Sequence, residues 1–449
     1  TGNDTFVFGA NLTSADKIEG GDGVDTLSIT DASLTAMNAL GVSAANVFNT
    51  NFNNVETVKV TDTINQTSFD AGYFGGATTF NVAAINGAET LAGLTSGSTV
   101  ELTITLSNTL TMSVTDQATG TGDALTVKLT NSADDDYTAI AVVDVEELTI
   151  DATEATASNN VRVGTVGVSM TKSLTTNPAQ TLKVIGTETV TVDTAIGAST
   201  IDASGMTVGL VTDAGLTMST AHTAAQTITG SGKVDTLFGS TKSDTINAGA
   251  GADSITSGAG GDTIDGGTGT DTYITTAADT GAAINGAGTG TSTGIVINLG
   301  TTAVTDAAVL GQVAQNISGS LASVGAGQAA YVFNGSLSSN SALVDTISNV
   351  ENITVADGIN YVVGSTGINV INGGSGTDYI SGGEGADTID PGDDGDIVSL
   401  TETTSAADIV QINAKTDGGL YFDGTDTDGV INKLSASQDL TTSAAATFG

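Results

Sequence analysis

The sequence contains no cysteine and no tryptophan, and only 2 of its 449 residues are proline and 1 is histidine. The missing cysteine excludes disulfides, thiolate zinc sites and thiol catalysis together. One histidine cannot build the two-histidine zinc site of a metalloprotease. Apolar runs of roughly 18 residues are also missing, so we expect no transmembrane helix.

Positive charge is scarce as well, because 10 Lys and Arg residues face 50 Asp and Glu residues, for a formal net charge of −40. Nucleic acids and anionic membrane surfaces are recognised through Lys and Arg, so we expect neither as a partner. Many carboxylates repel one another and oppose compaction, unless the chain is disordered or multivalent cations bridge them. The regular content of Val, Ile, Leu and Thr argues against disorder.

Catalytic motifs are weak. Residues 290–294 read GTSTG, which fits the G-x-S-x-G pattern of serine hydrolases. That chemistry needs a histidine downstream, whereas His222 lies upstream and is interpreted as a polar turn residue. We therefore predict that the protein is not an enzyme.

Glycine is abundant, with 59 residues, and much of it falls in nine-residue repeats. Residues 230–274 divide into five unbroken nonapeptides, and residues 364–399 divide into four. The sixth position holds aspartate, or asparagine once, and a large apolar residue usually follows two positions later. A single further copy, GGDGVDTLS, occupies residues 20–28. The consensus G-G-x-G-x-D-x-U-x, with U apolar, is typical of a parallel β-roll that binds calcium.

Each position of this repeat has a physical role. The glycines permit the positive φ angles of a tight turn and leave carbonyl oxygens bare, and the last three residues form a short strand with U inward. Calcium takes ~6–8 oxygen ligands, so it fits between stacked turns that supply carbonyls and carboxylates. We therefore predict Ca²⁺ as the bound cofactor. The predicted metal ligands are Asp25, Asp235, Asp244, Asp253, Asp262, Asp271, Asn369, Asp378, Asp387 and Asp396 at the sixth positions, and Gly249, Gly251, Gly258, Gly260, Gly267, Gly269, Gly374, Gly376, Gly383 and Gly385 in the turns.

Two repeats form one coil, so alternate repeats stack and their sixth positions form pairs. Asn369 offers a neutral oxygen, and we expect a weaker site there. Lys233 and Lys242 stand at glycine positions of the first two repeats, which predicts poor occupancy of the first site. The predicted pairs are Asp235 with Asp253, Asp244 with Asp262, Asp253 with Asp271, Asn369 with Asp387, and Asp378 with Asp396.

Outside the arrays, Thr alternates with Val, Ile or Leu in short runs such as 99–106 and 181–185, which predicts strands with one buried face. Residues 34–40 and 305–314 are candidates for short helices. A phrase recurs loosely and indicates a supersecondary unit that is used several times. It reads NNVETVKV at 53–60, VDVEELTI at 143–150, GTETVTV at 186–192 and NVENITV at 349–355.

The predicted fold is all-β, with parallel β-roll segments combined with β-solenoid-like sheet segments. The chain is expected to divide into six parts. These are an N-terminal repeat segment at 1–28, a Thr/Val-rich solenoid-like region at 29–229, the first array at 230–274, a β-rich intervening region at 275–363, the second array at 364–399 and a C-terminal region at 400–449.

The arrays resemble those of RTX (repeats-in-toxin) proteins, with their hemolysin-type calcium-binding repeats. Within that set, the order of motifs is similar to the crystalline surface-layer (S-layer) proteins of the Caulobacter type. The similar segments are NDTFVFG at 3–9, GGDGVDTL at 20–27, VEELTI at 145–150, TETVTV at 187–192, ASTIDASGM at 198–206 and LTTSAAAT at 440–447.

The resemblance implies type I secretion through an uncleaved C-terminal signal, and calcium-dependent self-assembly into a two-dimensional lattice on the bacterial cell surface. The implied partners are copies of the protein itself and a cell-surface polysaccharide, bound through a region outside this sequence. Because the sequence begins at Thr1 rather than Met, we expect it to be a processed or partial chain. The alternative function is a calcium-dependent RTX adhesin or biofilm matrix protein.

Overall fold

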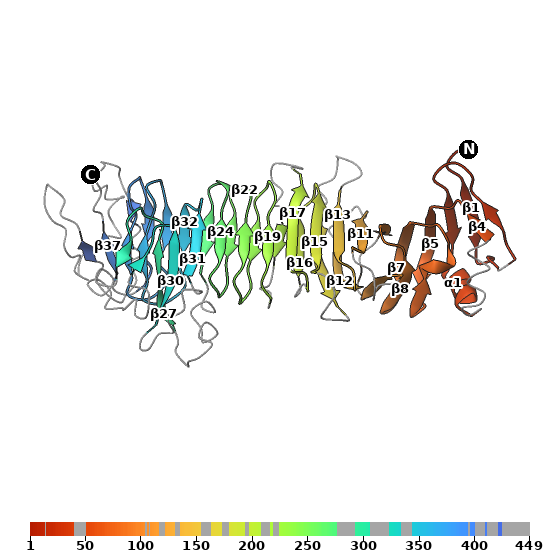
Figure 1. Ribbon diagram of the computed structural model, residues 1–449, viewed down its shortest axis with the longest axis horizontal. Coiled ribbons are helices and arrows are strands. Elements are labelled where there is room, and N and C mark those ends of the chain that lie inside the picture. Colours follow the sequence, from red (N-terminus) through yellow and green to blue (C-terminus); the bar gives the residue numbers. More distant parts are fainter. Residues whose placement is uncertain are drawn as a thin grey trace, which may run out of the picture. The chain divides into compact units, whose positions relative to one another are not determined.

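The described part of the chain is almost entirely β-structure, which confirms the predicted fold class (Figure 1). Contacts divide it into two compact units, one formed by Thr1–Thr220 with Ser231–Lys233 and one by Ala221–Gly230 with Val234–Gly449. No helix among the described residues is long and apolar enough to cross a membrane. The computed structural model describes residues 1–13, 15–39, 51–103, 106, 108–115, 122–130, 135–153, 163–172, 179–193, 197–207, 216–218, 224–275, 292–305, 323–333, 344–393, 396–399, 409–410 and 421–423.

The first unit contains two ladders of parallel strands, and the chain alternates between them as it winds. Such alternation is the geometry of a parallel β-solenoid. The first ladder consists of β1 (Thr5–Gly9), β3 (Thr26–Ile29), β5 (Thr57–Ile64), β7 (Thr79–Ile85), β9 (Ser98–Leu102), β11 (Ala124–Leu129), β13 (Glu147–Ala152), β15 (Thr181–Gly186) and β17 (Thr200–Met206). The second consists of β6 (Ser68–Asp70), β8 (Glu89–Leu94), β10 (Leu110–Val114), β12 (Asp135–Val143), β14 (Val163–Thr171), β16 (Val190–Asp193) and β18 (Leu216–Met218).

The alternating sequence explains why these strands stack in register. In a strand, successive side chains point to opposite faces. Val58, Phe80, Val100 and Val127 are register partners that are at most 2% exposed, so they form one inward column. Burying a side chain of this size stabilises the fold by roughly 1.5–3 kcal/mol. The solenoid core is therefore thin, and it is repeated coil by coil.

The remaining elements of the first unit are short. They include the two-stranded pair β2 (Ile18–Glu19) and β4 (Phe52–Asn53), helix α1 (Asp31–Asn38) and the 3-10 turn η1 (Ala71–Tyr73). The predicted helix at 34–40 thus exists, but it begins three residues earlier, with Asp31 in its first turn, where an acidic side chain is favourable. The second candidate helix lies outside the described residues from position 306 onward.

The second unit also winds through two ladders. One ladder runs through β20 (Thr236–Phe238), β23 (Ser254–Thr256), β26 (Thr272–Ile274), β32 (Asn352–Thr354), β34 (Val370–Asn372), β36 (Thr388–Asp390) and β38 (Ile409–Val410), all parallel. The other runs through β19 (Thr227–Thr229), β21 (Thr245–Asn247), β24 (Thr263–Asp265), β31 (Val344–Ser348), β30 (Gln328–Phe333), β27 (Ser292–Asn298), β33 (Tyr361–Val363), β35 (Tyr379–Ser381), β37 (Ile397–Ser399) and β39 (Tyr421–Asp423).

Apart from residues 231–233, the two nonapeptide arrays belong to this one unit, although a long stretch of sequence separates them. Tyr273 at the end of the first array pairs with Ile353, and Ile353 pairs with Ile371 of the second array. On this ladder the arrays therefore follow one another with only β32 between them. The predicted six-part division of the chain stays a prediction.

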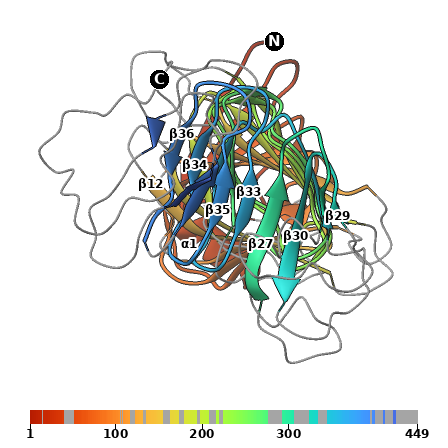
Figure 2. The ribbon, with the colours of Figure 1, turned by 90° about the vertical axis from the view of Figure 1, so that its left-hand side faces the viewer.

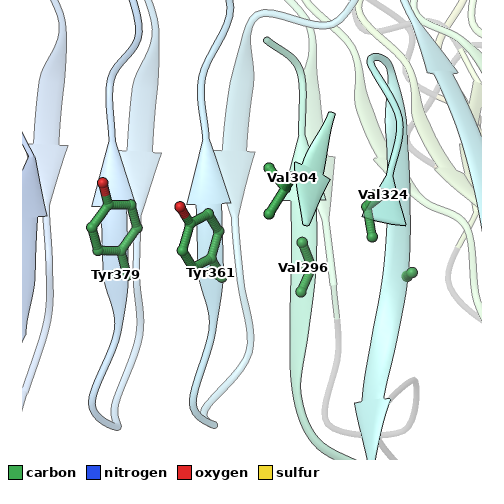
Figure 3. Close-up of a cluster of buried hydrophobic side chains, with 6 residues drawn as sticks. Val296, Val304, Val324, Tyr361 and Tyr379 are labelled. Atoms are coloured by element: carbon green, nitrogen blue, oxygen red, sulfur yellow. The ribbon is translucent and has the colours of Figure 1, made fainter. Parts of the chain in front are cut away.

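On the other ladder, four strands from the intervening region separate the arrays, and two of them, β27 and β30, pair with each other in antiparallel orientation. β30 pairs with β31, and β27 pairs with β33. Figure 2 shows β27 and β30 beside β33. The short strands β28 (Val304–Thr305) and β29 (Ser323–Val324) accompany them. Val296, Val304 and Val324 bury the stacked rings of Tyr361 and Tyr379, whose centroids are 4.4 Å apart (Figure 3).

Candidate metal centre

The sixth-position residues form a hydrogen-bonded column in each array. The backbone N–H of one aspartate donates to Oδ1 of the residue eighteen positions later, at 2.8–2.9 Å. This spacing is one coil, because strands of successive coils pair with the same offset. The structure thus brings together the predicted pairs, Asp235 with Asp253, Asp244 with Asp262, Asp253 with Asp271, Asn369 with Asp387, and Asp378 with Asp396.

These carboxylates are buried, and at most 3% of any sixth-position side chain in the arrays is exposed. Oδ2 of Asp253, Asp262, Asp271 and Asp378 has no hydrogen-bond partner in the described structure. Burying a charged oxygen is strongly unfavourable unless it is paired or coordinates a metal. The unpartnered Oδ2 atoms are therefore what a column of cation sites requires.

The turns bring carbonyl oxygens to the same places. All ten turn glycines predicted as ligands have positive φ angles, between 79° and 153°, which side chains other than glycine rarely adopt. At Gly230, a Cβ atom would overlap the carbonyl oxygen of Ala248 and lie 2.7 Å from Oδ2 of Asp235. Carbonyl and carboxylate oxygens thus converge between stacked coils, and calcium prefers such hard oxygen ligands.

The electrostatics agree with this arrangement. Burial raises the pKa of Asp253 to about 7, against the hydrogen bond from Asp235, and the neighbouring carboxylates add to the rise. Burial likewise raises the pKa of Asp378 to about 8. Burial and the carboxylate of Asp345 raise the pKa of Asp262. When calcium is bound, it supplies the positive charge that keeps such groups ionised and joins successive coils.

No group of three or more His, Cys, Asp or Glu side chains is placed to hold a metal ion in the described ranges. Beside the aspartates, the described turns offer backbone carbonyl oxygens as ligands, such as that of Ala248 near Asp235. This is the chemistry of the glycine turns, in which one carboxylate per turn is combined with bare carbonyl groups.

Asn369 differs from the aspartates. Its Nδ2 donates to the hydroxyl of Ser365 at 3.0 Å and to the carbonyl oxygen of Glu351. Its Oδ1 accepts from the Ser365 N–H at 2.8 Å and from the Ser365 hydroxyl. The amide is thus satisfied within the protein, and the weaker site expected there stays a prediction.

The lysine-bearing turns also have particular contacts. Lys233 is only 6% exposed, and its ammonium group donates to the carbonyl oxygen of Thr187 at 2.6 Å. Lys242 is exposed, and its carbonyl oxygen lies where a Cβ atom on Gly260 would contact it. Poor occupancy of the first site remains a prediction.

The isolated copy at 20–28 repeats the arrangement of the arrays. Asp25 is fully buried, its Oδ1 accepts the backbone N–H of Asp4 at 2.7 Å, and its Oδ2 has no hydrogen-bond partner in the described structure. Gly21 and Gly23 of the same turn have φ angles of 92° and 144°. The local geometry is therefore that of the array turns.

Three residues of the column were missed in the sequence. Gln226 and Asn360 stand nine positions before Asp235 and Asn369, and their N–H groups donate to Asp244 and Asp378. This nine-residue spacing could have identified them as sixth-position residues of a preceding repeat. Asp345 was not predictable, because nothing local indicates that its Oδ1 accepts the N–H of Asp262, at 2.9 Å, while its Oδ2 accepts the Tyr273 hydroxyl, at 2.6 Å.

The weak catalytic motif is not tested, because His222 and residues 290–291 lie outside the described part of the chain.

Four segments match the family model of the RTX calcium-binding nonapeptide repeat, at residues 12–28, 229–264, 238–273 and 356–398. They coincide with the turn of Asp25 and with the two arrays. No curated protein and no solved structure matches the chain. The chain thus carries RTX repeats, which bind calcium ions, so the predicted cofactor is confirmed. These repeats fit a calcium-dependent extracellular protein.

Proposed function

We propose that the protein is a structural surface-layer protein that leaves the cell by type I secretion, folds when calcium binds outside, and assembles with copies of itself into a two-dimensional lattice. The proposal assigns it no catalytic activity. Attachment to a cell-surface polysaccharide through a region outside this sequence belongs to the same proposal.

The observation that carries the lattice is a regular outer face on the first unit. Threonines occupy seven successive partner positions on the outer face of the first ladder, and each threonine is the strand partner of the next. A stiff solenoid with a repeating side chain offers the same contact at fixed intervals, which suits association between identical copies. The column consists of Thr5, Thr26, Thr57, Thr79, Thr99, Thr126 and Thr149.

A second column beside the threonines carries charges of both signs. Lys128 and Glu101 are register partners with an Nζ–Oε1 distance of 3.8 Å, and Asn81 donates to Glu101 at 3.2 Å. Alternating charge on a flat face favours a fixed register between copies.

Calcium provides the control over folding. A ligand that binds only the folded state stabilises it by mass action. Calcium modules outside cells work at Kd values of roughly 10⁻⁴–10⁻³ M. In a low-calcium cytosol the carboxylates of the arrays are uncompensated, so the unit that contains them stays loosely folded, which suits passage through a secretion channel, and its folding is completed outside.

Electron microscopy of the purified protein with and without millimolar calcium tests the proposal. We expect ordered sheets or tubes only with calcium. The variant Thr99→Lys with Thr126→Lys should abolish them, whereas Thr111→Lys on the other ladder should not. Monomers that persist in millimolar calcium would contradict the lattice and favour the adhesin or matrix function.

A further inference from the structure

A second kind of turn, unlike the glycine turns, occurs at residues 54–56 and 144–146 of the first unit and at residues 349–351 of the second. At 144–146 the sequence is Asp-Val-Glu, Asp144 has a φ angle of 54°, and Oε2 of Glu146 accepts the N–H of Asp123 at 2.8 Å. Residues 54–56 and 349–351 both read Asn-Val-Glu. Both asparagines have a φ angle of 52°, which is unusual for a residue with a side chain. The two valines are buried, at 4% and 6% exposure, and fix the turn to the core. We call these two segments the NVE turns.

Each NVE turn stacks directly on a glycine turn. The backbone N–H of Asp25 donates to Oε2 of Glu56 at 2.8 Å, and the N–H of Asp271 donates to Oε2 of Glu351 at 2.8 Å. In the arrays, this N–H is accepted by the aspartate of the next coil. The glutamate therefore takes the place of the missing sixth-position aspartate, over sequence separations of 31 and 80 residues.

The carbonyl oxygens are also in the corresponding places. A Cβ atom on Gly266 would overlap the carbonyl oxygen of Asn349 and lie 2.9 Å from Oδ2 of Asp271. A Cβ atom on Gly20 would overlap the carbonyl oxygen of Asn54 and lie 2.5 Å from Oδ2 of Asp25. The NVE turn thus presents a carbonyl group to the aspartate as a glycine turn does.

The aspartates at both places need a partner. Asp25 and Asp271 are fully buried, and in the described structure Oδ2 of each has no hydrogen-bond partner. We propose that each NVE turn completes a calcium site with the glycine turn below it, in which Asp25 acts with Glu56, and Asp271 acts with Glu351. The inference requires only that the repeats bind calcium, and it does not depend on the lattice.

The family-model matches contain neither glutamate, since they end at residues 28 and 273 and resume at residue 356. The proposed sites therefore add two carboxylate ligands. They also assign a role to the recurring phrase of the sequence. In the second unit, the site joins the end of the first array to a turn near the end of the intervening region and would fasten the first array to the coil that follows it.

The test measures calcium stoichiometry and affinity of the full chain by calorimetric titration. Glu56→Gln and Glu351→Gln keep an oxygen that accepts the aspartate N–H but lose the charge. Glu147→Gln is the matched control, because Glu147 lies on an outer face, paired with Lys183 at 2.7 Å. We expect each site variant to lose one calcium ion per chain, or to bind one ion at least tenfold more weakly, and the control to bind like the unaltered protein.

Two outcomes would overturn the inference. If both glutamine variants bind the same number of ions with unchanged affinity, the glutamates only cap the aspartate N–H groups. If Asp271→Asn with Glu351→Gln loses more ions than either change alone, the two side chains do not share an ion. Because circular dichroism with calcium checks the fold of each variant, failure to fold is separated from failure to bind.

Discussion

At the residue scale, the inner sixth-position aspartates such as Asp253 and Asp271 divide their two oxygens between two tasks. Oδ1 accepts a backbone N–H from the preceding coil, and Oδ2 of the inner residues lies buried without a protein partner. The first contact orients the side chain, and the second leaves a charge for calcium. Substitutions that separate charge from shape should therefore separate these two tasks.

Replacing Asp253 and Asp262 with Asn removes charge from every predicted pair of the first array and keeps the Oδ1 acceptors. We expect the calcium concentration at the midpoint of the far-ultraviolet dichroism change to rise at least tenfold, since calcium sites depend on ligand charge. Asp22→Asn, at an exposed turn position, is the control and should shift it little. An unchanged midpoint in the double variant would refute the pairing scheme.

The converse change at Asn369 should strengthen calcium binding. Asn369→Asp restores a carboxylate and removes the N–H groups that now donate to Glu351 and Ser365. We expect one additional or tighter calcium ion per chain in equilibrium dialysis. Asn352→Asp adds the same charge on a neighbouring strand and should add none. Equal binding by both variants would show that the sixth position has no special role there.

At the element scale, the glycine turns determine how closely the coils approach. Gly269 has a φ angle of 143°, and a Cβ atom there would overlap the carbonyl oxygen of Gly251. Gly232 has no heavy atom within 4 Å of the corresponding position. We expect Gly269→Ala to destabilise the protein by roughly 1–3 kcal/mol and Gly232→Ala to have little effect. Thermal unfolding in calcium measures both, and equal melting temperatures would contradict this account of the turn.

The arrays should also respond to pH when calcium is removed. The raised pKa values of Asp253, about 7, and Asp378, about 8, mean that the folded, calcium-free form holds protons that the unfolded chain releases. This contribution to stability is fully present below the unfolded pKa, near 4, and is lost as the pH rises to about 8. Urea unfolding in a chelator should therefore show a more stable protein at pH 5 than at pH 8.5. The opposite order would show that burial does not control these groups.

Some elements of the structure could be predicted from the sequence, and others could not. The nonapeptides were predictable because aspartate, or once asparagine, recurs at every ninth position. The apolar side chain two positions later points into the core in each repeat. The NVE turns were visible only as a repeated phrase. Their glutamates replace aspartates at separations of 31 and 80 residues, and no fixed period marks such pairs.

The insertion of β27 and β30 could not be predicted for a similar reason. Thr263 and Thr346 are strand partners, yet the two residues are far apart in the chain and no local pattern identifies the partner. Tyr361 and Tyr379 occupy outward positions of their repeats, and local periodicity would expose them to water. They are buried because a distant hairpin packs on them.

At the scale of the whole molecule, the chain has a net charge of −40, and its predicted calcium sites are divided unevenly between the two units. The second unit contains both arrays except residues 231–233, whereas the first contains one further matched repeat and coils with apolar columns. Calcium removal leaves buried carboxylates uncompensated mainly in the second unit. The two units should therefore differ in how strongly they depend on the ion.

Hydrogen exchange measured by mass spectrometry can test this difference. In a chelator, we expect protection to fall strongly at residues 236–274 and 361–399, and to persist at residues 79–102 and 124–150. The sample with calcium is the control and should be protected in all four segments. Equal loss of protection in both units would show that the apolar coils also depend on calcium.

The tyrosine contacts have a practical consequence. Because the chain has no tryptophan, its near-ultraviolet dichroism arises from 7 tyrosines and 11 phenylalanines, and such a signal requires fixed side-chain packing. Tyr273 is fully buried with its hydroxyl on Asp345, and Tyr361 and Tyr379 are stacked, all within the unit that contains the arrays. The unlabelled protein therefore carries its own optical reporter of calcium loading, and a titration needs neither a dye nor an engineered fluorophore.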